Sequence, residues 1–322
     1  MAIGGVPLPC LNGLRGRAGR LRNGMRNEAG NATGPLVEGG NAVERTVRLV
    51  AGLPEVCRLG LASRGNTHLR PQDAEHAIES GLNYLNWCGK PDGLSTAIAG
   101  LGARRRDVVV AVQFKARTGG EAERELASIL ARLKTDYLDV ATLYYVESER
   151  EWETIVSPGG AWETLARHKR GGALKLIGLT SHQRKLAARW TRSKTPASAG
   201  EYHIDLLMIR YNAAHRGAEE DVFPATRRRE MPVVTFTGLR WRDLLAATPA
   251  DPPGFRPPPA PECYRFCLAN PSVTVALSAP GDRAQLEENL RLLDDWRAPA
   301  EAALREMRAH GDRVKRFGRE FW

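Results

Sequence analysis

The chain has 322 residues, of which 42% are hydrophobic, and it carries a formal net charge of +10. That length and that hydrophobic content are typical of a globular protein with one large α/β domain or two ordinary ones. No apolar run reaches the roughly 20 residues that a membrane-spanning helix needs, and the first residues lack the apolar segment of a secretory signal. We therefore expect a cytoplasmic protein without a membrane partner.

The positive charge comes mostly from arginines scattered along the chain, with local runs at 104–106, 227–229 and 313–319. Such a charge attracts polyanions in general. No recognised nucleic-acid-binding motif accompanies the arginines, and a phosphate-bearing cofactor or an arginine-rich composition explains the charge equally well. We therefore do not expect nucleic acid to be a partner.

The five cysteines (Cys10, Cys57, Cys88, Cys263 and Cys267) are too few for a disulfide scaffold in a chain of this length, and they form no Cys-x-x-Cys pair. Cys263 and Cys267 are four residues apart on an expected helix and share one face. A metal or iron–sulfur site needs two more clustered ligands, which the sequence does not offer there. We expect buried apolar packing for this pair and no metal site.

Residues 1–44 are rich in Gly, Asn and Arg and contain almost no large apolar side chain after Leu21. Such a stretch cannot bury enough surface to offset the entropy that ordering costs. We expect a disordered extension ahead of a single domain at residues 45–322. The extension is a spacer, upstream sequence before a later start such as Met25, or a basic arm that binds a partner; the sequence leaves these alternatives open.

From Arg45 onward, short apolar runs alternate with helical patterns. A hairpin is expected from the runs 47–50 and 56–59, on either side of a Gly-containing turn. Eight strands are expected at 59–62, 82–87, 108–114, 138–145, 174–180, 204–209, 232–237 and 273–277. Helices are expected at 73–80, 94–101, 121–137, 162–169, 184–192, 218–229, 262–269 and 283–293. Eight alternations favour a closed (β/α)8 barrel over an open doubly wound sheet.

Polar side chains gather where the fifth and sixth strands end. The segment 180–182 is Thr-Ser-His, and the segment 211–212 is Tyr-Asn. In a barrel of this kind the C-terminal ends of the strands carry the site. The Pro-rich stretch 249–261, between the seventh strand and its helix, falls in a loop on that side and is a candidate lid.

Several landmarks recur in a familiar order and spacing. They are the hairpin before the first strand, 136–139 (Asp-Tyr-Leu-Asp), 177–182 (Ile-Gly-Leu-Thr-Ser-His), 204–205 (Ile-Asp) with 211–212, and 285–289 (Gln-Leu-Glu-Glu-Asn). Together they resemble the aldo-keto reductase superfamily over roughly residues 45–322. The run 210–219 is similar to a divergent branch of that superfamily, which lacks the usual catalytic tetrad.

The resemblance implies reduction of carbonyl groups with NADPH, with a tyrosine as general acid assisted by a lysine, an aspartate and a histidine. This chain departs from that pattern at all four positions. Asn86 stands at the aspartate position, the stretch 87–91 contains no tyrosine, Gln113 stands at the lysine position, and Tyr144 stands at the histidine position. The usual proton relay is therefore missing.

A tyrosine and a lysine at other positions of the barrel mouth could replace the missing general acid and its cation. Alternation along a strand puts Gln113 and Lys115 on one face, and Tyr144 lies at the end of the neighbouring strand. Tyr144 then serves as the acid and Lys115 as the cation that lowers its pKa. Alternatively, Tyr144 plugs the top of the barrel and Lys115 is a solvated rim residue.

For the cofactor, the resemblance assigns Thr180 and Ser181 to the nicotinamide amide, Phe236 to stacking on the ring, and Glu288 and Asn289 to the adenine. Four other positions depart from the family pattern: Met208 replaces a glutamine, Gln285 replaces the arginine that grips the 2′-phosphate, and Ala279 and Pro280 replace polar phosphate contacts. NADP remains the expected cofactor, although these four departures weaken the prediction. The alternatives are NAD or no cofactor.

Three further basic residues, His182, His215 and Arg216, lie near the expected mouth and either bind an anionic group or cap loops.

Three functions are consistent with the sequence. The first is an NADP-type oxidoreductase of the aldo-keto reductase fold that uses a rearranged acid on a small substrate bearing a carbonyl or an anionic group. The second is an inactive barrel that binds a ligand or a partner. The third is a non-redox enzyme, such as a lyase or cyclase using Tyr144, because the fold alone does not fix the chemistry.

Overall fold

The computed structural model describes residues 44–64, 69–191 and 202–318. The expected disordered extension at 1–44 lies outside the described residues, apart from Glu44. Within the described ranges, no helix is long and apolar enough to cross a membrane.

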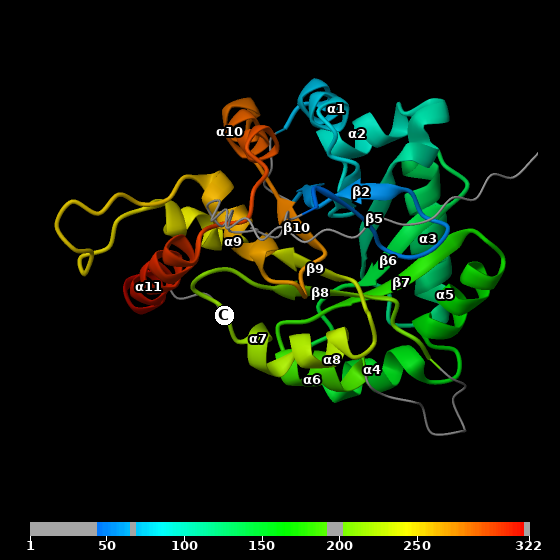
Figure 1. The fold of residues 1–322 in the computed structure, drawn as a ribbon. Coiled ribbons are helices and arrows are strands. Elements are labelled where there is room, and N and C mark those ends of the chain that lie inside the picture. Colours follow the sequence, from blue (N-terminus) through cyan, green and yellow to red (C-terminus); the bar gives the residue numbers. More distant parts are fainter. Residues whose placement is uncertain (1–43, 65–68, 192–201, 319–322) are drawn as a thin grey trace, which may run out of the picture. The chain divides into compact units, whose positions relative to one another are not determined.

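Eight parallel strands form a closed barrel, as predicted (Figure 1). The strands are β3 (Leu59–Ala62), β4 (Tyr84–Trp87), β5 (Val109–Phe114), β6 (Leu138–Leu143), β7 (Leu174–Thr180), β8 (Leu206–Arg210), β9 (Val233–Phe236) and β10 (Val275–Ser278). Pairing of β10 with β3, in the register that sets Leu277 against Gly60, closes the ring. The chain therefore folds as a (β/α)8 barrel.

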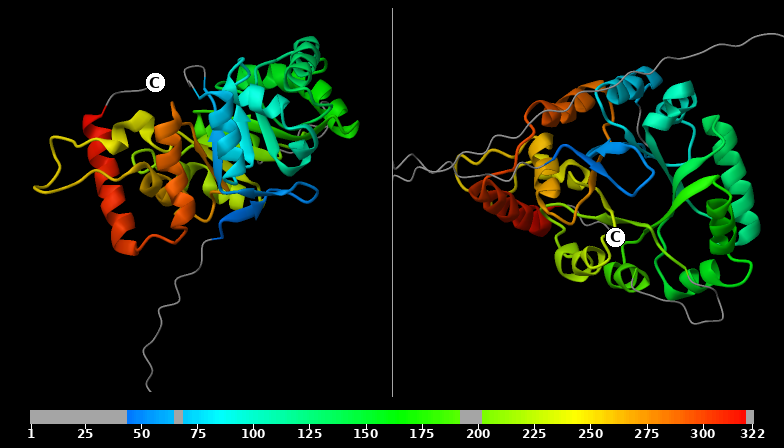
Figure 2. Two further views of the ribbon diagram at one scale, coloured as in Figure 1. Left: turned by 90° about the horizontal axis from the view of Figure 1, so that it is seen from above. Right: turned by 45° about the vertical axis from the view of Figure 1, so that its right-hand side comes forward.

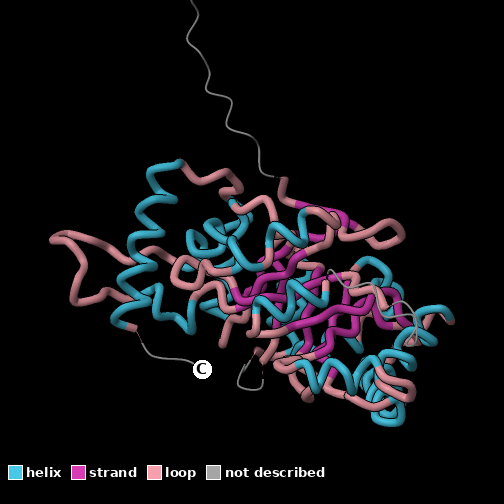
Figure 3. The backbone as a smooth tube through the Cα atoms, turned by 90° about the horizontal axis from the view of Figure 1, so that it is seen from below, coloured by secondary structure: helices cyan, strands magenta, loops and turns pink. Residues whose placement is uncertain are grey.

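Helices surround the strands (Figure 3). They are α1 (Pro71–Glu79), α2 (Gly93–Ala99), α3 (Gly119–Leu133), α4 (Glu149–Val156), α5 (Ala161–Arg170), α6 (Arg184–Trp190), α7 (Ala218–Asp221), α8 (Phe223–Arg227), α9 (Ala260–Ala269), α10 (Arg283–Asp294) and α11 (Glu301–Phe317), with the 3-10 helices η1 (Gly102–Asp107) and η2 (Arg240–Leu245).

The α-helices α4 and α11 and the two 3-10 helices were not predicted, and one predicted helix is broken. The start of α4 carries a signal that was overlooked: Ser148 accepts a hydrogen bond from the backbone N–H of Glu151, which the Ser-x-x-Glu spacing indicates. Helix α11 buries Met307 and Val314, seven residues apart, on one face. The helix expected at 218–229 divides into α7 and α8 because Pro224 cannot continue a helix from the preceding turn.

The apolar side chains form two layers separated by the barrel wall. Along β5, Val109 and Ala111 belong to the layer inside the barrel, whereas Val110 and Val112 belong to the layer under the helices. The inner layer, called the inner core here, comprises Leu49, Leu53, Val56, Ala62, Tyr84, Val109, Ala111, Val140, Leu176, Leu206, Met208, Val234, Val275 and Leu277. Cys263 and Cys267 lie buried in the outer layer, in keeping with apolar packing.

A two-stranded hairpin closes the N-terminal end of the barrel. Strands β1 (Thr46–Arg48) and β2 (Glu55–Cys57) pair antiparallel, and the hairpin contributes Leu49, Leu53 and Val56 to the inner core. Figure 2 shows the hairpin across one end of the strands. With that end closed by apolar side chains, a ligand has access to the interior only from the C-terminal end.

A buried carboxylate connects three strands near the closed end. Asp139, which is 0% exposed, lies 2.7 Å from Arg105 Nη1 and 2.8 Å from Lys175 Nζ, and it accepts a hydrogen bond from the backbone N–H of Val110. Both cations also lie 4.2 Å from the ring centre of Tyr137. Because a buried charge is costly unless it is paired, these residues hold η1, β5, β6 and β7 together as one unit.

Asp139→Asn is therefore expected to destabilise the protein by about 3–5 kcal/mol, because it leaves the buried Arg105 without a counter-ion. The matched control is Asp107→Asn, since Asp107 is 69% exposed and lies 3.9 Å from Arg106; its expected cost is below about 1 kcal/mol. Urea unfolding of the two variants tests the difference. Equal midpoints would contradict a structural role for the Asp139 cluster.

Candidate active site

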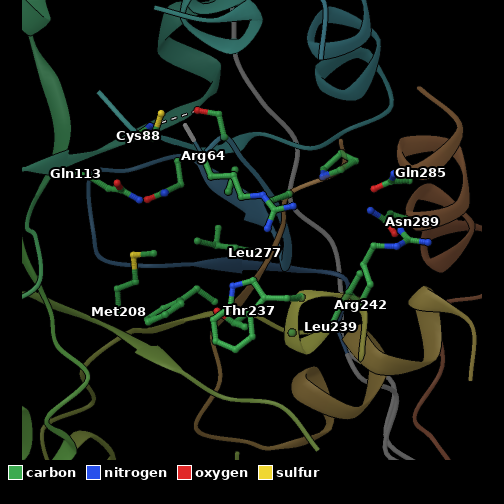
Figure 4. Close-up of a pocket in the computed structure, with 18 of the residues that line it drawn as sticks. Arg64, Cys88, Gln113, Met208, Thr237, Leu239, Arg242, Leu277, Gln285 and Asn289 are labelled. Atoms are coloured by element: carbon green, nitrogen blue, oxygen red, sulfur yellow. Dashed lines mark hydrogen bonds between the residues drawn. The ribbon is translucent and has the colours of Figure 1, made fainter. Parts of the chain in front are cut away.

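A pocket of about 230 Å³ opens at the C-terminal ends of the strands. Its lining comes from most of the barrel strands and the loops that follow them: Ala62, Ser63, Arg64, Asn86, Cys88, Gln113, Tyr144, Tyr145, Met208, Phe236, Thr237, Gly238, Leu239, Trp241, Arg242, Leu277, Ala279, Pro280, Gln285 and Asn289. Figure 4 shows Gln113 and Met208 on one side of this pocket and Gln285 and Asn289 on the other.

Three of the four expected catalytic residues line the pocket, and Lys115 does not. Asn86, Gln113 and Tyr144 face the pocket from β4, β5 and the end of β6. Lys115 is exposed, and its backbone N–H donates to Glu125 Oε1 at 3.0 Å. Strand β5 ends at Phe114, so alternation no longer applies at position 115 and the chain is already turning toward α3. The structure does not bring Lys115 to Tyr144 in the pocket.

A second tyrosine faces the pocket, which alternation did not predict. Tyr145 has a left-handed backbone (φ 47°), so its side chain is not turned to the far side of the wall. Its ring stacks on that of Tyr144 with centroids 3.8 Å apart and an interplanar angle of 22°. Strand β6 ends at Leu143, which frees the next two residues from the strand geometry. Both hydroxyl-bearing rings thus reach the pocket.

The two tyrosines differ in their surroundings. Burial and a side-chain hydrogen bond with Tyr145 raise the pKa of Tyr144 above its ordinary value. The ring of Tyr145 also contacts those of His182 and Phe236, with centroids 4.2 Å and 6.4 Å away. Both tyrosines therefore bring a phenol hydroxyl to the pocket.

A histidine and a carboxylate stand behind Tyr145. The ring of His182 lies 4.2 Å from that of Tyr145 and 5.9 Å from that of Phe236. Glu147 Oε1 lies 3.1 Å from His182 Nδ1 and accepts a hydrogen bond from the His182 backbone N–H. Burial and the positive charge of Arg210 lower the pKa of His182, against the opposing effect of Glu147. His182 thus packs against the tyrosine in a fixed orientation.

Several polar atoms beneath the pocket have no hydrogen-bond partner among the described residues. Asn86 is 1% exposed, and neither its Nδ2 nor its Oδ1 has a partner; the same holds for the hydroxyls of Thr142 and Thr180. Buried polar groups are normally paired, so unpaired groups next to a pocket indicate a place for a ligand or ordered water.

The residues expected to bind a cofactor are only partly brought together. Phe236 and Asn289 line the pocket, and Asn289 Nδ2 donates to Ser278 Oγ at 2.8 Å. Thr180 and Ser181 are fully buried at the end of β7, just below the lining residues. Glu288 lies outside the pocket, because its Oε1 accepts a hydrogen bond from the backbone N–H of Ala260 at the start of α9.

Backbone strain concentrates at the mouth. Seven described non-glycine residues have positive φ, and five of them border the pocket or its mouth: Tyr145, Thr237, Arg240, Trp241 and Arg242. Such conformations cost free energy and persist where the surrounding structure imposes them, often at functional sites. The turn after β9 is what brings Trp241 and Arg242 to the pocket; sequence analysis missed both, since no local pattern signals a left-handed run.

The Pro-rich stretch 249–261 is not a lid over this pocket. None of its residues is part of the lining, and Phe255 instead packs against α11, with its ring 4.9 Å from that of His310 and 4.8 Å from the Arg313 guanidinium. Asp251 pairs with Arg313 as well. The loop extends away from the strands at the left of Figure 1, because its aromatic and acidic side chains are held by α11.

Of the basic residues near the mouth, Arg216 pairs with Asp312, 2.7 Å away, and donates to the Ala213 carbonyl, so it ties a loop to α11. His215 is different. Burial, with the positive charges of Arg240, Arg210, Lys315 and Arg184, lowers its pKa to about 4. Arg240 Nη1 lies 3.4 Å from His215 Nε2, so a proton on that nitrogen would face a guanidinium.

This histidine should make the protein sensitive to acid. Its pKa in the folded state is depressed from 6.5 to about 4. The contribution of neutral His215 to the free energy of unfolding is therefore fully present above pH 6.5. It is lost as the pH falls toward 4, because the unfolded chain binds a proton at this histidine before the folded chain does. His215→Gln should flatten the decline of thermal stability in that window, whereas His203→Gln, at a side chain 61% exposed, should not. An unchanged slope in His215→Gln would contradict the burial of a neutral imidazole.

Comparison with known proteins points to one family. A model described as the aldo/keto reductase family matches residues 71–241. An uncharacterized oxidoreductase of Bacillus subtilis (strain 168), YrpG, is 24% identical over 193 residues, which are 51% of this chain and 56% of that protein. The match thus spans little more than half of that relative.

Solved structures share the fold. The holo form of an aldo-keto reductase from Bacillus halodurans superposes with a TM-score of 0.64 at 18% identity, covering 84% of this chain and 96% of that one. An aldo-keto reductase from Klebsiella pneumoniae in complex with NADPH gives a TM-score of 0.63 at 17% identity, covering 80% and 92%. Since the family model covers more than half of the sequence and the barrel has the same architecture, the chain belongs to the aldo/keto reductase family.

Proposed function

We propose that the protein is an oxidoreductase that reduces a carbonyl group at the mouth of the barrel with a reduced nicotinamide dinucleotide. The observation that supports this most directly is the stacked pair Tyr144 and Tyr145, which brings two phenol hydroxyls to the pocket. The family and the NADPH complex of the Klebsiella pneumoniae structure support the choice of cofactor class.

The residues of the pocket fit a nicotinamide. The buried hydroxyl of Thr180 lacks a partner among the described residues and is suited to a carboxamide. Phe236 lines the pocket and offers a ring face beside it, and Met208 completes an apolar surface. When bound, the reduced dinucleotide supplies a hydride.

In the proposed reaction, the carbonyl carbon gains a hydride and the electrons of the C=O π bond move to the oxygen. That oxygen takes the hydroxyl proton of Tyr145, which balances the step and gives an alcohol and the oxidised dinucleotide. Tyr144, which stands at the histidine position of the family pattern, donates a hydrogen bond to the phenolate that forms. Asn86 and Gln113, on the neighbouring strands β4 and β5, offer neutral amide groups to the carbonyl oxygen.

For the choice between dinucleotides, Arg242 is the residue of interest. Figure 4 shows it at the end of the pocket that holds Gln285 and Asn289. Gln285 itself is engaged in its own loop, where it accepts from the Gly281 N–H and donates to Asp282 Oδ2. A guanidinium delivered by the turn after β9 takes the place of the missing cation at position 285, and this favours NADP over NAD.

Fluorescence titration tests binding, because Trp241 lines the pocket. NADPH should quench the fluorescence saturably, and Trp241→Phe should remove much of that quenching. Arg242→Met should weaken NADPH binding about 10- to 100-fold while changing NADH binding little, since a charge-assisted contact to a phosphate is lost. No response to either dinucleotide at millimolar concentration would overturn the proposal.

Turnover with a panel of aldehydes and quinones tests the acid. Tyr145→Phe should lower kcat about 10²- to 10⁴-fold with NADPH affinity unchanged, because only a proton donor is removed. Tyr144→Phe, the matched control at the neighbouring position, should cost about 10-fold, the effect of one lost hydrogen bond. A Tyr145→Phe enzyme as active as the wild type would show that the proton comes from elsewhere.

A further inference from the structure

Arg210, at the mouth, forms no ion pair with any residue in the described part of the chain. Arg210 is the last residue of β8, two positions beyond Met208, so alternation puts it on the inward face one layer above the inner core. It is half-buried, its Nε is buried without a hydrogen-bond partner, and no carboxylate of the described residues forms an ion pair with its guanidinium. Among the described residues, its guanidinium packs against the ring of Trp241, whose centre lies 5.2 Å away.

The surroundings of Arg210 are strongly positive. Arg184, Arg240 and Lys315 all act on His215 through their charges, together with Arg210. Arg184 pairs with Asp221 and Arg240 lies 3.7 Å from Asp243, so both have a carboxylate of their own. Glu147, whose charge also acts on Arg210, is engaged by His182. Burial lowers the pKa of Arg210, a cost that the described residues do not offset.

Arg210 adjoins the reacting end of the pocket, although it is not one of the lining residues. Its charge interacts with Tyr145, and its stacking partner Trp241 lines the pocket. At the end of the pocket with Gln285 and Asn289, Arg242 is the cation proposed to bind a phosphate of the cofactor. An anion held by Arg210 would therefore sit beside the proton donor rather than at the far end.

We infer that Arg210 is the recognition site for an oxyanion, supplied by a carboxylate on the substrate, so that the protein acts on carbonyl compounds that carry an acid group. The inference rests on the proposed function for the reaction, but the anion site itself does not depend on turnover. A planar guanidinium binds a carboxylate through two parallel hydrogen bonds. Trp241 holds the plane of the guanidinium, which reduces the entropy lost on binding.

The first experiment measures anion binding without any reaction. Malonate, titrated calorimetrically, should bind the wild type, and Arg210→Met should bind it about 10- to 100-fold more weakly. Arg210→Lys should retain an intermediate affinity, because it keeps the charge and loses the paired geometry. Arg228→Met removes one exposed arginine from the opposite end of the barrel and is expected to leave binding unchanged. Malonate binding that is the same in wild type and Arg210→Met would overturn the inference.

The second experiment assigns the source of the oxyanion. Wild type should prefer a keto acid to its methyl ester in kcat/KM, and Arg210→Met should lose that preference through KM, with kcat for the ester and NADPH affinity retained. If Arg210→Met instead loses NADPH affinity, the oxyanion is a cofactor phosphate and the substrate assignment is wrong. If kcat falls equally for acid and ester, Arg210 acts on Tyr145 and not on a carboxylate. A wild type that binds malonate and reduces nothing would overturn the proposed function alone.

Thermal melting separates these effects from misfolding. Arg210→Met replaces a half-buried cation whose Nε is unpaired with an apolar side chain of similar length, so its melting temperature should equal or exceed that of the wild type. A clear fall in melting temperature would show that Arg210 supports the fold through a contact beyond Trp241, and this would contradict its assignment as a recognition residue.

Discussion

The architecture depends on how the interior of the closed barrel is filled. Alternation along each strand sends every second side chain inward, and the ring is narrow enough for those side chains to fill it. Toward the hairpin the inward positions are apolar, as at Val109 and Leu206. Toward the other end they become polar, as at Gln113 and Arg210 on the same strands. The pocket exists because the apolar filling stops one layer below the mouth.

The proposed acid, Tyr145, lies at a position where the alternation of side chains along the strand no longer holds. Alternation predicts that the side chain of Tyr144 faces the pocket. The side chain of Tyr145 also reaches the pocket because its backbone is left-handed. The strain at Tyr145 is offset by stacking on Tyr144 and by contact with His182. A further run of left-handed residues places Trp241 and Arg242 on the opposite side. Chemistry that the family places on the strands is carried here, in our proposal, by the turns that follow them.

These features explain what could be predicted from the sequence. Strands were predictable because a parallel sheet buried on both faces demands continuous apolar runs, and 59–62 and 174–180 match the observed β3 and β7 to the residue. Asn86, Gln113 and Phe236 were assigned to the site by the family resemblance, and all three line the pocket. The failures begin where strands end. Lys115 turns toward α3, Glu288 turns to α9, and the Pro-rich stretch follows α11, because each is captured by a partner distant in the sequence.

The central claim is that hydride is transferred to a carbonyl carbon at this mouth, with Tyr145 as the acid. Reduced NADP labelled with deuterium at the transferable position of the nicotinamide tests it most directly. After incubation with a keto acid, mass spectrometry and NMR of the product should find deuterium on the new carbinol carbon in the wild type, and a rate of label transfer lowered about 10²- to 10⁴-fold in Tyr145→Phe. Label that stays on the dinucleotide while the dinucleotide is demonstrably bound would contradict the claim.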